Sequence, residues 1–248
     1  MHSFAVQRHP EWQLVVVDDR STDDIGVVLE RYRGAVPSIT WIKIDKSVAP
    51  IPIPENGMGV ATSMNIGVRH SRHDCIIRID PETMQITKTL WKAGELDLAS
   101  TWYVPVYDIG PDHQNQIEAN WEVWKDDPSS IPAKAVPPIE NPLKTFWYFQ
   151  AVWSREKFLS IGGIDEQFNA GAACEDDDFA NRMHKIAPPK HPDNGMLALH
   201  QYHGPRLWWG TPEHRTNYLY LTDANRPRPL VVNEGINSDS CIREIVEL

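Results

Sequence analysis

The sequence has no apolar run that approaches the roughly 20 residues needed to cross a lipid bilayer. Its first residues also lack the continuous apolar core of a secretory signal peptide, because His2, Arg8 and His9 interrupt the short apolar pieces. These two absences predict a cytoplasmic protein with no membrane span.

Cysteine and positive charge are both scarce. The three cysteines, Cys75, Cys174 and Cys241, are too widely spaced to indicate a disulfide framework or a zinc cluster. Lysine and arginine total 24 against 34 aspartates and glutamates, so the net charge is −10. This charge argues against general binding of duplex nucleic acid, which needs a basic face. A nucleotide ligand stays possible, because a divalent cation can neutralise its phosphates.

Short apolar runs alternate with helix-like segments through about residue 80. Continuous β-branched runs of this kind are typical of strands buried on both faces of a parallel sheet. We expect strands over residues 13–17, 39–44 and 75–79, and helices over 25–32, capped by Ser21, and 60–70. The alternation predicts one α/β domain with a mostly parallel sheet.

The second half is less regular. We expect further strands over residues 102–107 and 146–153 and a helix beginning near Glu175. Residues 126–142 are rich in proline and predict a long loop.

Acidic residues follow two of the predicted strands. Asp18 and Asp19 end the first, where ligands of open α/β sheets bind and where a carboxylate can accept a hydrogen bond from a base or a ribose. Asp80 and Glu82 flank Pro81 after the third, and such oxygens are the ligands that Mg²⁺ and Mn²⁺ prefer. Taken separately, the first pair is equally suited to a helix-start turn, and the second segment is more simply an Asp-Pro turn.

A run of four carboxylates, residues 175–178, begins the helix that carries Phe179. Such a run is common at a solvated helix start, but an aspartate there could also act as a general base. His200 and His203 follow an apolar run and could complete a metal site, although histidines in loops are more often structural. Two histidines without a nearby cysteine do not indicate a closed zinc site.

The order of these segments resembles the nucleotide-sugar glycosyltransferases of the GT-A fold, particularly family 2 and its galactosyltransferase-like relatives. Residues 11–23 look like the family's first nucleotide-binding segment, and 56–67 look like its Asn/Gly-marked helix. Asp80-Pro81-Glu82 occupies the place of the Asp-x-Asp motif. Residues 162–168 and 175–179 resemble the acceptor-side motif, and His203, rather than His200, falls where several relatives place a metal-binding histidine.

The resemblance, which covers residues 11–203, implies transfer of a hexose or N-acetylhexosamine, with inversion, from a UDP-sugar to a hydroxyl. The acceptor would be a glycan, a glycoconjugate or another hydroxyl-bearing molecule. The implied nucleotide-binding residues are Asp18, Asp19, Asn56 and Asn65. Asp80, Glu82 and His203 would hold Mn²⁺ or Mg²⁺. Asp176 would be the catalytic base, Glu175 would position a sugar, and Trp208, Trp209 and Gly163 would contact sugar or acceptor.

Two departures from the family pattern stand out. Only about a dozen residues precede the Val15 strand, so we expect the family's first strand to be missing. Glu82 replaces the usual second aspartate, and its longer side chain changes the ligand geometry. We expect residues 1–100, approximately, to bind the nucleotide-sugar and residues 101–248 to bind the acceptor and carry the catalytic base.

Three other functions stay open. A degenerate, non-catalytic domain that binds nucleotide-sugar or glycan would fit the missing strand. A retaining transferase would share the same sequence pattern. A metal-dependent hydrolase fits less well, because no paired-histidine motif lies on a predicted helix.

Overall fold

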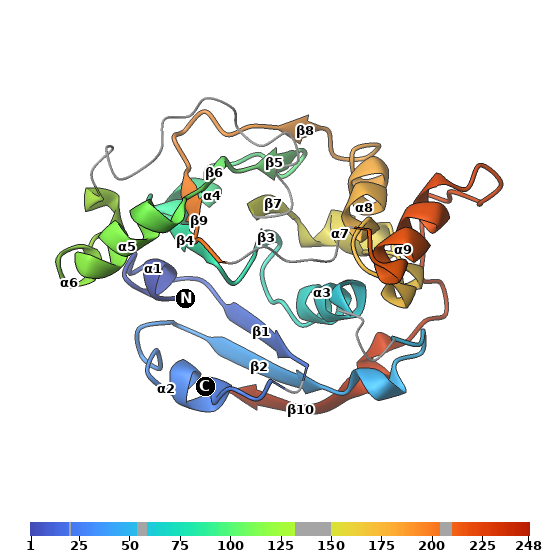
Figure 1. Cartoon of the computed structure of the whole chain (residues 1–248), viewed down its shortest axis with the longest axis horizontal. Coiled ribbons are helices and arrows are strands. Elements are labelled where there is room, and N and C mark those ends of the chain that lie inside the picture. The colour runs from blue at the N-terminus through green and yellow to red at the C-terminus, as the bar shows by residue number, and fades with distance from the viewer. Residues whose placement is uncertain (20, 54–58, 132–149, 204–209) are drawn as a thin grey trace.

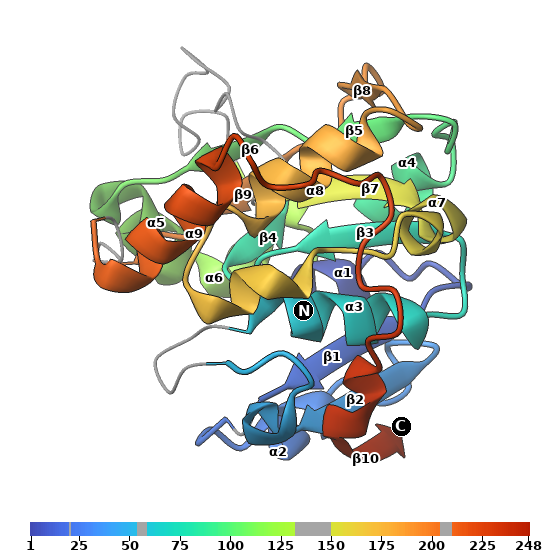
Figure 2. The same cartoon turned by 90° about the vertical axis from the view of Figure 1, so that its right-hand side faces the viewer.

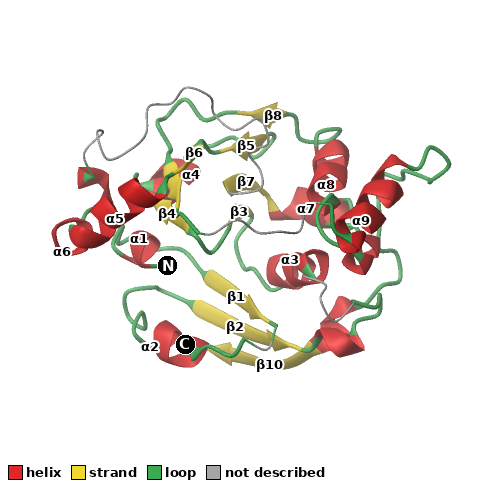
Figure 3. Ribbon diagram, viewed as in Figure 1, coloured by secondary structure: helices red, strands yellow, loops and turns green. Residues whose placement is uncertain are grey.

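The computed structural model describes residues 1–19, 21–53, 59–131, 150–203 and 210–248. Its strands form three small sheets with helices around them (Figure 3). The strands are β1 (Leu14–Asp18), β2 (Ile39–Ile44), β3 (Cys75–Ile79), β4 (Thr83–Gln85), β5 (Thr101–Tyr103), β6 (Val106–Asp108), β7 (Gln150–Ser154), β8 (Pro189–Lys190), β9 (Ala198–His200) and β10 (Ile242–Glu247).

Helices cover the sheets and connect their strands. The α-helices are α1 (His2–Ala5), α2 (Ile25–Glu30), α3 (Val60–Arg69), α4 (Thr89–Ala93), α5 (Pro111–Ala119), α6 (Trp121–Trp124), α7 (Arg155–Ser160), α8 (Glu175–Met183) and α9 (Pro212–Thr222). Short 3₁₀ turns are η1 (Lys46–Val48), η2 (Pro128–Ser130), η5 (Glu166–Ala170) and η6 (Ser238–Cys241). Among the residues described, no helix combines the length and apolar character that a bilayer crossing requires.

The first sheet has the order β1-β2-β10. β1 runs parallel to β2, and β10 runs antiparallel to β2 on its other side. Alternate β1 residues face opposite layers: Leu14 and Val16 pack in the cluster that contains α2, whereas Val15 and Val17 pack in the cluster that contains α3. Both views place α3 between this sheet and the rest of the molecule (Figures 1 and 2).

The second sheet, β3-β7-β5-β8, carries the largest core on one face. Ile76 of β3 and Trp153 of β7 pack there against Phe179 and Met183 of α8, and Trp153 and Phe158 stack at 6.0 Å. The other face packs against α4 through Ala93. α8 is therefore held firmly on the Ile76 face of β3.

The third sheet has the order β4-β9-β6 and packs on α5 and α6. β4 pairs antiparallel with β9, with Thr83 opposite His200. This pairing joins the Asp80–Glu82 turn to the histidine segment, although more than 100 residues separate them in the sequence.

The α/β class is confirmed, but the expected mostly parallel sheet is not found, because each of the three sheets contains both parallel and antiparallel pairs. The strand predicted over 102–107 is two strands in different sheets, since Pro105 between them has no N–H to donate. The predicted cap Ser21 is also wrong: Asp24 caps α2 by accepting from Val27 N at 3.2 Å. The expected loop over 126–142 contains the short turn η2, and its part beyond residue 131 lies outside the described residues.

Candidate active site

The candidate site lies where the end of β3 meets the beginning of α8. Side chains alternate along a strand, so Arg78 shares the face of Ile76, which packs against α8. Arg78 extends from that face to Asp80, and its Nη2 lies 2.7 Å from the Asp80 carboxylate. Both side chains are largely buried, with 14% of Arg78 and 23% of Asp80 exposed.

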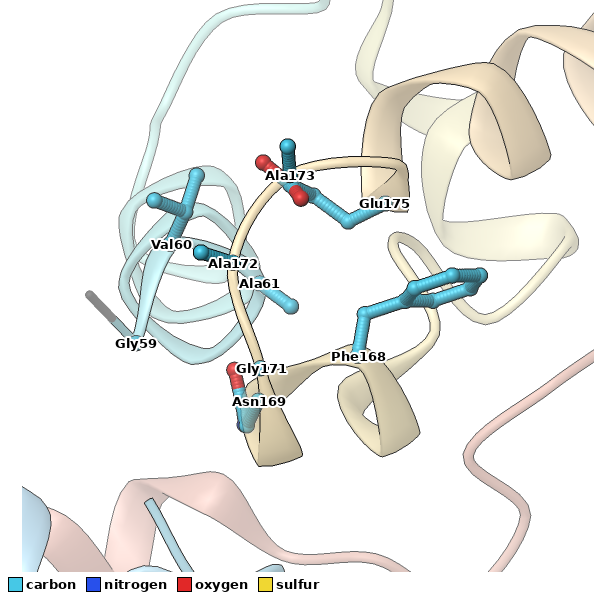
Figure 4. Close-up of a pocket in the computed structure, with 9 residues that line it drawn as sticks. All are labelled: Gly59, Val60, Ala61, Phe168, Asn169, Gly171, Ala172, Ala173 and Glu175. Carbon is cyan, nitrogen blue, oxygen red and sulfur yellow. The ribbon is translucent and has the colours of Figure 1, made fainter. Parts of the chain in front are cut away.

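Glu175 begins α8 and extends toward the first turn of α3, where Val60 and Ala61 line the same small pocket (Figure 4). Burial raises the pKa of Glu175, the Arg78 guanidinium lowers it, and the carboxylate of Asp80 raises it. The charges of Arg78 and Asp80 thus act directly on Glu175. The structure therefore brings the end of β3 and the start of α8 into one site.

Asp176 lies beside Glu175 and is only 3% exposed. Its Oδ1 accepts a hydrogen bond from Asp177 N at 3.1 Å, and its buried Oδ2 has no hydrogen-bond partner within the described part of the chain. Burial raises the pKa of Asp176 to about 9, and the charges of Glu175 and Asp177 add to the shift. A buried carboxyl with one free oxygen is suited to exchanging a proton with a bound ligand.

The chain turns sharply before these carboxylates. Ala173 and Cys174 both have left-handed backbones, with φ of 61° and 68°, which costs about 1–3 kcal/mol at each non-glycine residue. Asn217 of α9 holds this turn, because its Nδ2 donates to the carbonyls of Ala173 at 2.7 Å and Phe168 at 2.8 Å. Backbone strain is therefore concentrated directly before Glu175, as is common at functional sites.

The last carboxylate of the run, Asp178, is used within the protein. Arg182 Nε donates to it at 2.7 Å and Arg226 Nη2 also lies 2.7 Å away, in a buried network that includes Asp165. Arg226 also lies over the Tyr220 ring, 4.0 Å from its centroid. Asp178 therefore fixes α8 in place.

The histidine segment lies at the same end of β3 as Asp80. The pairing of β4 with β9 continues to Gln201, whose backbone N donates to the Glu82 carbonyl at 3.0 Å. The ring of His203 is 5.1 Å from that of His200, whose Nδ1 is 2.8 Å from an Asp108 oxygen. Glu82 and the two histidines thus share one edge of the fold.

The predicted metal ligands match a divalent cation in chemistry but not in their present arrangement. Two carboxylates and an imidazole suit Mn²⁺ or Mg²⁺. However, the described His, Cys, Asp and Glu residues form no group of three close enough to hold an ion. At Asp80, the Arg78 guanidinium already pairs with one of the two carboxylate oxygens.

The two aspartates after β1 have separate environments. Asp18 accepts from Ser21 N at 2.8 Å and from Trp41 Nε1 at 3.3 Å, in a pocket on the α2 side of the first sheet. Asp19 forms an ion pair with Lys46, which follows β2, at 2.9 Å. The carboxylate of Asp18 thus stabilises a turn beside that pocket, and Asp19 is held by the cation of Lys46.

Two other predicted residues are enclosed in the protein. The Asn65 side chain exchanges hydrogen bonds with Ile164 and donates to Glu166 at 2.9 Å. A Cβ on Gly163, whose φ is 73°, would lie 2.2 Å from Asn65 Oδ1, so the glycine permits close packing. These contacts give both residues structural roles. The predicted residues Asn56, Trp208 and Trp209 lie outside the described residues.

Sequence reasoning missed three residues that build the site: Arg78, Glu166 and Asn217. Glu166 is fully buried and accepts hydrogen bonds from Thr62, Asn65 and Ser238, so it ties α3 to the turn that leads to α8. Arg78 left a usable signal, because it is a charged residue inside an otherwise apolar strand.

Comparison with known proteins finds a family similarity over the first third of the chain. Residues 1–82 match the family model described as Glycosyl transferase family 2. The chain is similar to the "Putative teichuronic acid biosynthesis glycosyltransferase TuaG" of Bacillus subtilis (strain 168), with 27% identity over 97 residues. That match covers 39% of this chain and 32% of the relative, so the chain spans less than half of that relative's length.

Among solved structures, the chain is similar to the catalytic domain of Drosophila beta1,4-galactosyltransferase 7, crystallised in complex with xylobiose. The TM-score is 0.45 with 13% identity, over 83% of this chain and 78% of that chain. The match to the family model lies over residues 1–82, which include β1, α3, β3 and the Asp80–Glu82 turn. This part of the chain is thus similar to glycosyltransferase family 2.

Proposed function

We propose that the chain is a GT-A-type glycosyltransferase that moves a hexose or N-acetylhexosamine from a UDP-sugar to an acceptor hydroxyl, with inversion. The supporting observation is that Arg78 pairs with Asp80 at 2.7 Å, while the charges of Arg78 and Asp80 also act on Glu175, which adjoins Asp176 at the start of α8. A donor site and a general base must adjoin for sugar transfer, and the match of residues 1–82 to the family model supports the same reaction.

In this proposal, Asp80, Glu82 and His203 would hold Mn²⁺ or Mg²⁺, and the bound cation would supply positive charge to the leaving diphosphate. Asp19 binds the uracil base, and Glu175 positions the sugar. Asp176 accepts the proton of the acceptor hydroxyl at its free Oδ2 as the oxygen attacks the anomeric carbon. Residues up to about 100 bind the donor, and later residues bind the acceptor.

A donor panel tests the transfer step. We expect UDP-linked sugars to raise the midpoint of thermal unfolding only when Mn²⁺ is present, and a labelled sugar to pass to a glycan or glycoconjugate acceptor. Asp176→Asn should abolish transfer without abolishing donor binding. Asp112→Asn, the same change at an exposed residue of α5, is the control. Donor binding by the wild-type chain without transfer to any acceptor would instead favour a non-catalytic binding domain.

The neighbouring aspartates give a matched test of the nucleotide site. Asp19→Asn should weaken UDP binding at least about tenfold, because a hydrogen bond to a charged group contributes about 1.5–3 kcal/mol. Asp18→Asn should change the affinity by less than about twofold, since that carboxylate serves the Ser21 turn. Isothermal titration calorimetry measures both affinities, and equal effects of the two changes would contradict this assignment.

A further inference from the structure

Asn169 is a buried side chain whose oxygen has no hydrogen-bond partner within the described part of the chain. It lies in η5, is 2% exposed and lines the same small pocket as Glu175. Its side-chain oxygen is turned toward Gly171 on the wall of this pocket (Figure 4). A buried carbonyl oxygen without a donor is costly, so it indicates a position where a ligand supplies one.

Two buried neighbours fix which end of the Asn169 amide faces the pocket. Asn169 Nδ2 donates to Thr62 Oγ1 at 2.7 Å, and Thr62 Oγ1 donates to Glu166 Oε2 at 3.0 Å. Because carboxylate oxygens accept hydrogen bonds, the single hydroxyl proton of Thr62 is directed at Glu166, and its lone pairs are left for the amide N–H. The donors therefore run in one direction, from Asn169 to Glu166, and the acceptor Oδ1 is presented to the pocket.

The pocket has room only for a small group. It offers about 10 Å³ of space for the centre of a water-sized group, which corresponds to one water molecule or one hydroxyl. Apart from Asn169 and Glu175, its lining residues carry no polar side chain: Gly59, Val60, Ala61, Phe168, Gly171, Ala172 and Ala173. A hydroxyl fits this pocket, because it is small and can donate its proton to Oδ1.

We propose that Asn169 Oδ1 accepts a hydrogen bond from one hydroxyl group of a bound sugar and that Thr62 is the positioning residue that holds the amide in this orientation. The inference rests on the proposed function in one respect, namely that the molecule bound beside Glu175 is a sugar. The hydroxyl belongs to the donor sugar or to the acceptor, which present the same chemistry to the pocket. Asn169 thereby distinguishes a hydroxyl at that position from a group that cannot donate.

Deoxyfluoro sugars test the proposal, because their fluorine takes the place of a hydroxyl but donates no hydrogen bond. Calorimetric titration of the full chain, in buffer containing Mn²⁺, compares UDP-glucose and UDP-galactose with their monodeoxyfluoro analogues. Methyl β-glucoside and its own analogues, in the presence of UDP, form the acceptor series. In the wild type, fluorine at one position should weaken binding about tenfold. In Asn169→Ala the same replacement should change the affinity by less than about twofold. Asn225→Ala, the same change at an exposed residue, should retain the wild-type ratio.

Two threonine variants test the positioning role. Thr62→Val leaves the amide able to reverse, so the ratio of hydroxyl to fluorine affinity should fall toward one, whereas Thr62→Ser should retain it. A merely structural role of Thr62 would change stability and leave this ratio unmoved.

The outcomes are distinct. A ratio coupled to Asn169 in the UDP-sugar series assigns the hydroxyl to the donor, and one in the glucoside series assigns it to the acceptor. A wild-type ratio in Asn169→Ala overturns the hydroxyl site, as does a wild type that binds every fluorinated analogue as tightly as its parent. A wild-type ratio in Thr62→Val overturns the positioning role.

Neutron diffraction from crystals of the wild-type chain, without sugar, covers the case in which the variants do not fold. The deuterons of the Asn169 amide should point to Thr62, and an ordered water in the pocket should donate to Oδ1. An amide deuteron directed into the pocket, or a pocket without water, overturns the proposal. If no probe sugar binds, the proposed function fails, and the neutron map alone then decides the orientation of Asn169.

Discussion

Asp176 combines a buried carboxyl group with an adjacent carboxylate on each side. The unfolded chain would ionise this group near its ordinary pKa, while the folded chain retains the proton up to a pH of about 9. Between these two values the folded state binds more protons than the unfolded state, so its stability must fall as the pH rises. The same carboxyl can act as a base only after it has lost that proton.

Asp176→Asn should therefore stabilise the cation-free chain at pH 8. We expect the midpoint of thermal unfolding to rise by at least about 2 °C, equivalent to about 1 kcal/mol for a chain of this size. The gain should disappear at about pH 3, below the ordinary pKa of 3.8, where the aspartate is largely protonated in both states. Calorimetry at the two pH values measures the difference. A variant no more stable than the wild type at pH 8 would show that Asp176 is ionised in the folded chain.

Individual residues also mark how far the sequence could predict the site. Asp80, Glu175 and Asp176 were identifiable because carboxylates follow a strand or begin a helix in a family-like order. The ion pair between Arg78 and Asp80 could not be identified from the sequence. Whether two side chains two residues apart at a strand end meet depends on what packs against that face of the strand. The enclosure of Asn65 also depends on Glu166, about a hundred residues away.

At the scale of elements, α8 is held by its buried ion network as well as by its apolar face. Arg226 contacts Asp165 at 3.1 Å and Asp178 at 2.7 Å, and 6% of its side chain is exposed. Loss of the arginine would leave two buried carboxylates with less compensation. The network therefore secures the helix whose first turn carries Glu175 and Asp176.

Arg226→Gln should lower the free energy of unfolding by about 3 kcal/mol, the usual cost of removing one partner from a buried ion pair. Urea unfolding measures the change. Arg228→Gln provides the control, because Arg228 is exposed and makes a single hydrogen bond to the Leu221 carbonyl at 2.7 Å. Equal decreases in the free energy of unfolding of the two variants would mean that the buried ion network stabilises the fold no more than the exposed Arg228 does.

Elements with strong local patterns were the predictable part of the fold. β1, β2, β3, α3 and α8 begin and end close to their expected positions, because apolar runs and an acidic helix start are local signals. β6 carries only three residues, and the partners of β6 and β10 lie far away in the sequence. The structure therefore has three mixed sheets where the sequence predicted one mostly parallel sheet.

At the scale of the whole molecule, β10 connects the last residues of the chain to its first sheet. Ile39 and Leu248 exchange backbone hydrogen bonds at 3.3 and 2.9 Å, and Thr40 donates to Glu247. Cys241, just before β10, is fully buried in the cluster that contains Ile42 and Ile44. The proposed donor half is therefore completed by residues from the opposite end of the sequence.

Removal of residues 242–248 should destabilise that half. We expect the midpoint of thermal unfolding to fall by at least about 5 °C, because β2 would lose one of its two partners. Hydrogen exchange should show lost protection first in β2. Glu244→Gln, which removes only an exposed ion pair with Lys43, should leave both measurements nearly unchanged. Unaltered exchange in the shortened chain would show that β10 is dispensable.

The long interval between β2 and β10 also has a consequence during synthesis. About 200 residues separate the two strands, and a ribosome that adds about 5–20 residues per second needs about 10–40 s to make them. Throughout that time the nascent chain exposes one edge of β2, with Ile39, Ile42 and Ile44 along it. The newly made polypeptide thus carries an unpaired β2 edge until β10 emerges from the ribosome.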